Sequence, residues 1–308
     1  MTTTSAQPRT DSSTAPVGST TGARVHHPYS SWFYLPAAVI YGLLFAIPTF
    51  ASFYFSLTRW SIFESRFIGF DNFVTFFREP ALLKGFTNTL IYALVTSGTK
   101  VVLGLLLAVL LTSQIVARGY LRSVVFFPVL VSTIGVGLTF TVLMNPERGL
   151  INSALGVVGV TGPGWLTDPK YALLSVALVD VWKGVGLATL IYIAGIVSIP
   201  NEYFEAAKVD GAGAWDNFWQ IVLPLARPAT VTVVILSLIG GLRSFELIWA
   251  MTRGGPGFTS DVIASVIYKQ YQAGFYGLAT AGNIVLFVLV SVIVFPMSRY
   301  FNAREVES

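Results

Sequence analysis

The stretch 32-WFYLPAAVIYGLLFAIPTFASFYFSL-57 contains no charged residue. A helix of this length and composition can cross the roughly 30 Å hydrocarbon core of a bilayer. Other runs with few or no charges follow it, at 85–117, 123–146, 171–200, 228–252 and 270–298. The sequence therefore predicts an all-α integral membrane protein with six transmembrane helices.

The composition supports this class. Of the 308 residues, 54% are hydrophobic and only 11% are charged, whereas a soluble globular chain carries about 25% charged residues. A membrane β-barrel would need segments of about ten residues with alternating polarity, and these runs are longer and uniformly apolar. Cysteine is absent, which excludes disulfides and thiol chemistry. The net charge of +4 is spread over the loops, so we expect a lipid bilayer and no nucleic acid as partner.

The chain divides into a tail, a membrane domain and a second tail. Residues 1–30 are rich in Thr, Ser, Pro and Gly and are expected to form a disordered cytoplasmic tail. Residues 31–300 form the expected transmembrane domain, and 301–308 a second cytoplasmic tail. Lys and Arg are equally numerous on the two sides of the membrane, but Arg118 and Arg122 flank a very short loop, which favours cytoplasmic termini. The spans are expected at about 33–57, 87–112, 121–144, 172–197, 226–250 and 279–299.

A polar segment, 202-EYFEAAKVDGAGAWDNFWQIVLPLARP-228, separates the fourth and fifth apolar runs. Pro200 favours a helix start, and Glu202 would lie at the positive end of the helix dipole. The small residues that follow would let this helix approach another surface closely. From the residues alone, a docking element and a plain connector are equally good interpretations.

The spacing of 205-EAA-207, Gly211 and 221-IVLP-224 resembles the EAA motif of ATP-binding-cassette (ABC) importer permeases. Two flanking segments, 180-DVWKG-184 and 252-TRGGPGFTSDV-262, resemble the carbohydrate branch, of the maltose and glycerol-3-phosphate type. The resemblance implies a type I ABC importer permease fold, with 202–217 as a coupling helix that contacts a cytoplasmic ATPase. It also places both termini in the cytoplasm. The residues that it assigns to coupling are Glu205, Ala206, Ala207, Asp210, Gly211, Ile221, Leu223 and Pro224.

Five charged residues lie within the expected spans: Lys100, Asp180, Lys183, Arg243 and Glu246. A charge near the centre of a membrane helix is costly and by default marks a function. Asp180 and Lys183, like Arg243 and Glu246, are three residues apart and are expected to pair along one helix. Such pairs either only neutralise themselves or contact substrate. Lys100 has no such neighbour, and the sequence assigns it no role.

Two helical stripes are candidates for the substrate pathway. The second of them consists of small and polar residues, which either pack helices together or line a cavity. In the maltose-type relatives that the chain resembles, the sugar contacts come from the corresponding faces. We expect Asp180 to accept hydrogen bonds from substrate hydroxyls and Lys183 to donate them. The full set is Asp180, Lys183, Gly184, Leu187, Ser237, Gly240, Gly241 and Ser244, with Arg243 and Glu246.

The expected function is transport rather than catalysis. The phosphate-binding pattern GxxxxGK[ST] does not occur, and no metal site or cofactor is expected in this chain. The resemblance implies a second homologous permease, an ATPase dimer that binds ATP and Mg, and an extracytoplasmic substrate-binding protein, at the cell (inner or plasma) membrane. A carbohydrate or polyol is the expected substrate, with glycerol-3-phosphate or a glycerophosphodiester as alternatives. An ion-coupled secondary transporter and an intramembrane enzyme that use Asp180 or Glu246 are the rival interpretations.

Overall fold

The computed structural model describes residues 31–305. The chain separates into two units, 1–48 and 49–308. The expected tails over 1–30 and 306–308 lie outside the described residues, whereas 301–305 continue the last helix.

The first apolar run is helical over Trp32–Ser56. It consists of the 3₁₀ turn η1 (Ser31–Tyr34), α1 (Leu35–Tyr41), the π-helical turn η2 (Gly42–Ala46) and α2 (Ile47–Ser56). Most of its side chains are exposed, as expected for a helix whose surroundings are lipid or a partner.

A short hairpin follows α2 in the second unit, a small departure from the all-α prediction. Strands β1 (Thr58–Trp60) and β2 (Ser65–Phe67) are antiparallel, with Arg59 opposite Arg66. Helix α3 (Asp71–Arg78) follows. The buried Asn72 amide holds it to the hairpin by donating hydrogen bonds to the carbonyls of Ser56 and Thr58, each at 2.8 Å.

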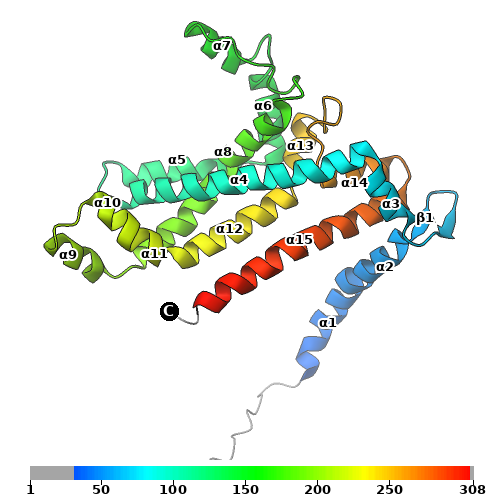
Figure 1. Cartoon of the computed structure of the whole chain (residues 1–308), viewed down its shortest axis with the longest axis horizontal. Helices are drawn as coiled ribbons and strands as arrows, with labels where there is room; N and C mark the ends of the chain where they lie inside the picture. The colour runs from blue at the N-terminus through cyan, green and yellow to red at the C-terminus, as the bar shows by residue number, and fades with distance from the viewer. Residues whose placement is uncertain (1–30, 306–308) are drawn as a thin grey trace, which may run out of the picture. The chain divides into compact units, whose positions relative to one another are not determined.

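Four long helices form the frame of this unit: α4 (Pro80–Thr112), α8 (Ala172–Val197), α12 (Arg227–Leu242) and α15 (Tyr276–Glu305). α4 packs mainly against α8 and α12, and Figure 1 shows these three side by side. Small residues allow the close approach. A Cβ added to Gly104 would lie 2.8 Å from the Cβ of Ala188, and one added to Gly241 would lie 2.7 Å from the Cα of Ala93.

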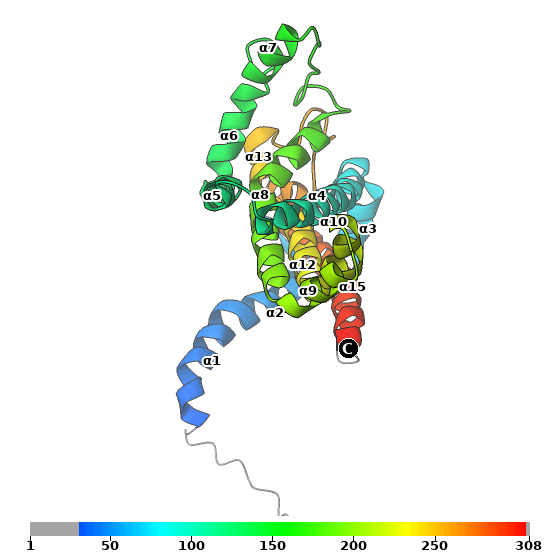
Figure 2. The ribbon, with the colours of Figure 1, turned by 90° about the vertical axis from the view of Figure 1, so that its left-hand side faces the viewer.

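Two of the expected spans are bent. Helices α5 (Arg118–Leu130) and α6 (Thr133–Leu143) meet at 97°. The chain is extended at Val131, and the Ser132 hydroxyl caps α6 by accepting a hydrogen bond from the Gly135 amide. Figures 1 and 2 show α6 and α7 (Leu150–Val157) projecting away from the bundle of α4, α8 and α12. The single span expected over 121–144 is thus two helices.

The expected span 226–250 also ends early. α12 stops at Leu242, and α13 (Glu246–Met251) is a separate short helix. The weak helix formers Gly240 and Gly241 directly precede the break. As a result, Arg243 and Glu246 do not share one helix, and the ion pair expected between them is not formed in the part of the chain that the structure describes. A loop and α14 (Ile263–Gln272) lead to α15.

The described residues contain four helices long and apolar enough to cross a membrane, and up to six if each bent pair counts as one span. The bent pairs are α5 with α6, and α12 with the segment 214–225. The helical membrane class predicted from the sequence is confirmed. Figure 1 places α9 (Asn201–Val209) and α10 (Ala214–Asn217) at one end of the second unit, and α3, α14 and the hairpin at the opposite end.

Candidate functional site

An ion pair between two helices lies at the centre of the predicted substrate pathway. The Lys100 ammonium on α4 donates a hydrogen bond to Asp180 Oδ2 on α8 at 2.8 Å. Lys100 is buried and Asp180 is partly buried. Asp180 therefore pairs with Lys100 across two helices and not with Lys183 along its own helix. Lys100, to which the sequence assigned no role, is therefore the ion-pair partner of Asp180.

Gly184, the glycine in the predicted stripe on α8, explains how the Lys100 side chain reaches Asp180. Gly184 lies one helical turn after Asp180 on α8. A Cβ added there would lie 2.7 Å from Cε of Lys100 and 2.9 Å from its ammonium nitrogen. Glycine thus leaves the space through which the lysine side chain passes, which is a structural reason for this residue type.

A small cavity of about 180 Å³ adjoins the ion pair. Lys100, Gly184 and Leu187 line it from the α4 and α8 side, and Ser237 and Gly240 from α12. Four predicted pathway residues are therefore brought together at one cavity. The small and polar stripe on α12 therefore lines a cavity at Ser237 and Gly240, one of the two roles expected for it.

Gly241 differs from its neighbour Gly240. It is buried against Ala93 and Thr96 of α4, so it serves helix packing rather than the cavity. The sequence left two roles open for the stripe on α12, helix packing and cavity lining. Gly241 packs against α4, and Gly240 lines the cavity.

Ser244, in the break between α12 and α13, and Asp180 on α8 both lie near one tyrosine, Tyr92. The fully buried Tyr92 hydroxyl on α4 lies near both Ser244 and Asp180, without a hydrogen bond of standard geometry to either. Tyr92 was missed by sequence reasoning, because an aromatic residue in an apolar run gives no signal of its own. Lys100, in contrast, was recognisable from the sequence, because a charged residue inside a membrane span requires a partner.

Three further pathway candidates do not line this cavity. Lys183 is partly buried, and Arg243 and Glu246 are exposed. No ion pair of theirs occurs within residues 31–305. They stay candidates on position alone.

The loop 252–262 is fastened to α14 through the buried Asp261 carboxylate, and to α4 through hydrogen bonds from Asn88 to loop backbone carbonyls. Asp261 accepts hydrogen bonds from the Ser265 hydroxyl at 2.7 Å and from the Lys269 ammonium at 2.6 Å. The Asn88 amide on α4 donates to the Asp261 carbonyl at 2.8 Å. Burial raises the pKa of the Asp261 carboxyl, and the contacts with Lys269 and Ser265 oppose this rise. Gly254, at φ +84°, has no room for a Cβ beside this carboxylate, so the loop geometry requires glycine.

The predicted coupling segment forms two short helices rather than one. α9 ends in a Schellman turn: the Ala212 amide donates to the Ala207 carbonyl at 2.9 Å, and the Gly211 amide to that of Lys208 at 3.2 Å. This turn requires a positive φ, and Gly211 has φ +79°. α10 then begins where the Asp216 carboxylate accepts from the Gly213 amide at 2.9 Å. The motif glycine, Gly211, therefore sets the turn between the two helices.

The side chains of this segment face outward. Glu205, Ala206, Asp210 and Gly211 are exposed and Ala207 is partly buried. Ile221 lies in the π-helical turn η3 (Phe218–Val222), and Leu223 and Pro224 lie in α11 (Leu223–Leu225), which leads into α12. Sequence reasoning missed two large apolar neighbours, Val209 at 87% exposed and Trp215 at 71%. Exposed apolar side chains on a polar segment are typical of a docking surface.

Residues 100–306 match a family described as "Binding-protein-dependent transport system inner membrane component". The chain belongs to this family. It is a membrane permease component of a transport system, as the EAA motif indicated, and the rival interpretations as an ion-coupled carrier or an intramembrane enzyme are set aside.

Two relatives and one solved structure cover most of the chain. A probable ABC transporter permease protein, YurN of Bacillus subtilis (strain 168), is 33% identical over 89% of this chain and 97% of its own length. The trehalose/maltose transport system permease protein MalF of Thermococcus litoralis is 33% identical over 83% of this chain and 88% of its own. The crystal structure of a bacterial ABC transporter involved in the import of the acidic polysaccharide alginate has a TM-score of 0.78 and 26% identity, and the match covers 88% of this chain and 94% of that one. The type I importer permease fold predicted from the motif is thereby confirmed.

Proposed function

We propose that this chain is the permease subunit of an ATP-driven carbohydrate importer and forms half of its translocation pathway. The family match carries this proposal, and two features of the chain support it. The helices α4, α8 and α12 gather polar groups around a cavity inside a membrane bundle. The segment 201–217 offers an exposed surface at one end of the same bundle.

The partners follow from the family description and the relatives. A binding-protein-dependent system needs an extracytoplasmic protein to deliver substrate, and a second permease to complete the pathway. ATP hydrolysis is assigned to a separate ATPase dimer, which binds ATP and Mg, because this sequence has no phosphate-binding loop. The exposed motif residues Glu205 to Gly211, with Val209 and Trp215, form the surface on which that ATPase acts. Both termini then lie in the cytoplasm.

The substrate class is a carbohydrate or polyol. The trehalose/maltose permease is one of the relatives. The Lys100–Asp180 pair presents hydrogen-bond donors and acceptors together without net charge, and this combination suits a hydroxyl-rich neutral molecule. In the transport cycle, ATP binding would close the ATPases, move the coupling segments and open the cavity toward the binding protein.

Transport in a reconstituted system tests the proposal. Proteoliposomes that contain this chain with its second permease and its ATPase, and to which the binding protein is added, are expected to take up labelled sugar only when ATP is supplied. A thermal-shift screen of the binding protein against maltose, trehalose and glycerol-3-phosphate selects the substrate to be labelled. Uptake by the permease alone, driven by an ion gradient, would contradict the proposal.

A further inference from the structure

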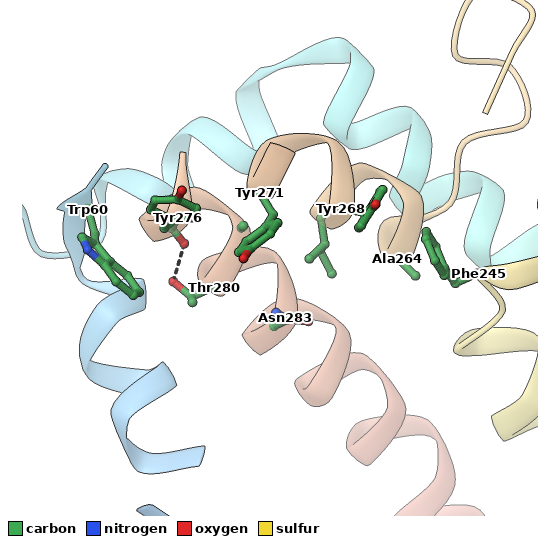
Figure 3. A pocket seen from close by; sticks show the side chains of 10 residues that line it. Trp60, Phe245, Ala264, Tyr268, Tyr271, Tyr276, Thr280 and Asn283 are labelled. Carbon is green, nitrogen blue, oxygen red and sulfur yellow. Dashed lines mark hydrogen bonds between the residues drawn. The ribbon is translucent and has the colours of Figure 1, made fainter. Parts of the chain in front are cut away.

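A second cavity, of about 560 Å³, lies at the end of the bundle opposite α9 and α10. Its size falls within the range of pockets that bind small molecules, about 300–1,000 Å³. Trp60 of β1, residues of α14 and α15, and Phe245 before α13 line it, and Figure 3 shows their side chains around one space. None of the ten residues that line it is charged.

Aromatic rings close both ends of this cavity. At one end, the ring of Tyr276 lies 5.3 Å from that of Trp60 and 5.3 Å from that of Tyr271, between centroids. At the other end, the rings of Phe245 and Tyr268 are 5.2 Å apart. Figure 3 shows Trp60 and Phe245 at opposite ends of the labelled set.

A polar stripe on α15 lies between these ends. Tyr276, Thr280 and Asn283 follow one another at helical spacing and line the same cavity. The Thr280 hydroxyl is satisfied by the Tyr276 carbonyl at 3.0 Å. The Asn283 amide is exposed and makes no hydrogen bond to any part of the chain within residues 31–305.

The position of Asn283 on α15 favours a polar surrounding over lipid. It lies seven residues inside an apolar helix that is long enough to cross the membrane. Facing lipid at that depth, its amide would lose hydrogen bonds to water without replacement. Tyrosine and tryptophan at a membrane surface are ordinary interfacial residues, but an asparagine deeper on the same face requires a polar partner.

We infer that this cavity is an outer carbohydrate subsite, which holds an uncharged sugar ring before it reaches the Lys100–Asp180 site. The inference rests on the proposed function. A sugar ring has apolar C–H faces and a rim of hydroxyls. The rings of Trp60 and Tyr276 cover such faces, and the Asn283 amide donates to and accepts from the rim. Because the lining carries no charge, the subsite favours neutral sugars over glycerol-3-phosphate.

The two sites are adjacent along the chain. Phe245 lines the outer cavity, and the preceding residue, Ser244, lies near the Tyr92 hydroxyl beside Asp180. The break between α12 and α13 thus presents consecutive residues to both sites. A sugar that leaves the aromatic cavity meets the charged pair next.

Transport by the complete importer tests this subsite, with labelled maltose and labelled trehalose as probes. Asn283→Leu and Tyr276→Leu are each expected to lower the rate of ATP-dependent uptake of these sugars by about tenfold, the effect of one or two lost contacts. They are also expected to change the ratio of the maltose rate to the trehalose rate. Tyr276→Phe, which keeps the ring, is expected to restore part of the loss. Phe295→Leu, on an exposed part of α15 outside the cavity, is the matched control and should behave as the wild type.

Three outcomes would overturn the inference in distinguishable ways. If Asn283→Leu and Tyr276→Leu keep both rates and their ratio, no sugar is held there. If either variant loses the second permease on copurification, a partner helix occupies the cavity instead. If the wild-type importer carries no sugar with ATP, including any that its binding protein selects in the thermal-shift screen, the proposed function fails, and the subsite fails with it.

Discussion

At the scale of single residues, the Lys100–Asp180 pair joins α4 to α8 beside the membrane cavity. Two charges are tolerated inside the bundle because each offsets the burial of the other. The sequence identified both as unusual but paired Asp180 with the wrong lysine. Spacing along one helix says only which residues share a face. The packing of α4 against α8 places Lys100 next to Asp180. Gly184 leaves the space that the lysine side chain occupies.

Charge removal separates the structural role of this pair from its role in transport. Lys100→Met leaves Asp180 without its cation and is expected to destabilise the protein by about 1–3 kcal/mol, less than for a fully buried pair because Asp180 is partly exposed. The double variant Lys100→Met, Asp180→Leu removes both charges and is expected to recover most of that stability. Thermal unfolding in detergent measures both changes.

The same variants decide whether the pair contacts substrate. We expect ATP-dependent sugar uptake to be lost in the double variant even though its stability recovers. Wild-type uptake by a stable double variant would mean that the pair only holds α4 to α8.

At the scale of elements, glycines and capping residues determine where the helices turn. The single coupling helix expected over 202–217 is interrupted because Gly211 adopts a left-handed conformation. The bend between α5 and α6 follows from the extended backbone at Val131 and the cap at Ser132. Both signals were present in the sequence. Apolar periodicity alone cannot reveal them, since a bent span has the same composition as a straight one.

Substitution at Gly211 tests the turn. Gly211→Val forces a β-branched residue into positive φ, at a cost of roughly 1–2 kcal/mol, and is expected to shift α10 relative to α9. The expected result is ATPase activity in the assembled importer that no longer responds to the substrate-loaded binding protein. Gly213→Ala is the matched control, because Gly213 is extended at φ −82° and the added Cβ would meet only Asp216 at 3.5 Å. Normal stimulation in Gly211→Val would show that the turn has no role in coupling.

At the scale of the whole molecule, the second unit, 49–308, presents distinct surfaces at its two ends. One end carries the exposed segment 201–217, and the other carries the hairpin, α3 and the aromatic cavity. The proposed function puts the first end in the cytoplasm and the second outside. The numbers of Lys and Arg on the two sides do not decide this orientation, which therefore needs a direct measurement.

Cysteine labelling can measure the membrane orientation, because the chain has no cysteine of its own. Phe63→Cys and Val209→Cys introduce single thiols at sites that are 93% and 87% exposed. In intact cells, a membrane-impermeant maleimide is expected to label Phe63→Cys only. Val209→Cys is expected to react only after the membrane is permeabilised. The reverse pattern would place the coupling segment outside and contradict the proposed ATPase contact.

The sequence by itself determined the membrane class, the family and the location of the polar segment, because each depends on composition or on local spacing. Uncharged runs are long enough for a bilayer whatever their arrangement, and the EAA motif lies within one continuous stretch. Only the tertiary structure decided which charges pair, which glycines pack and which line a cavity, and where aromatic and polar groups meet. Those relations join residues far apart in the chain, such as Lys100 with Asp180 and Trp60 with Tyr276. They depend on how helices pack, which no local pattern specifies.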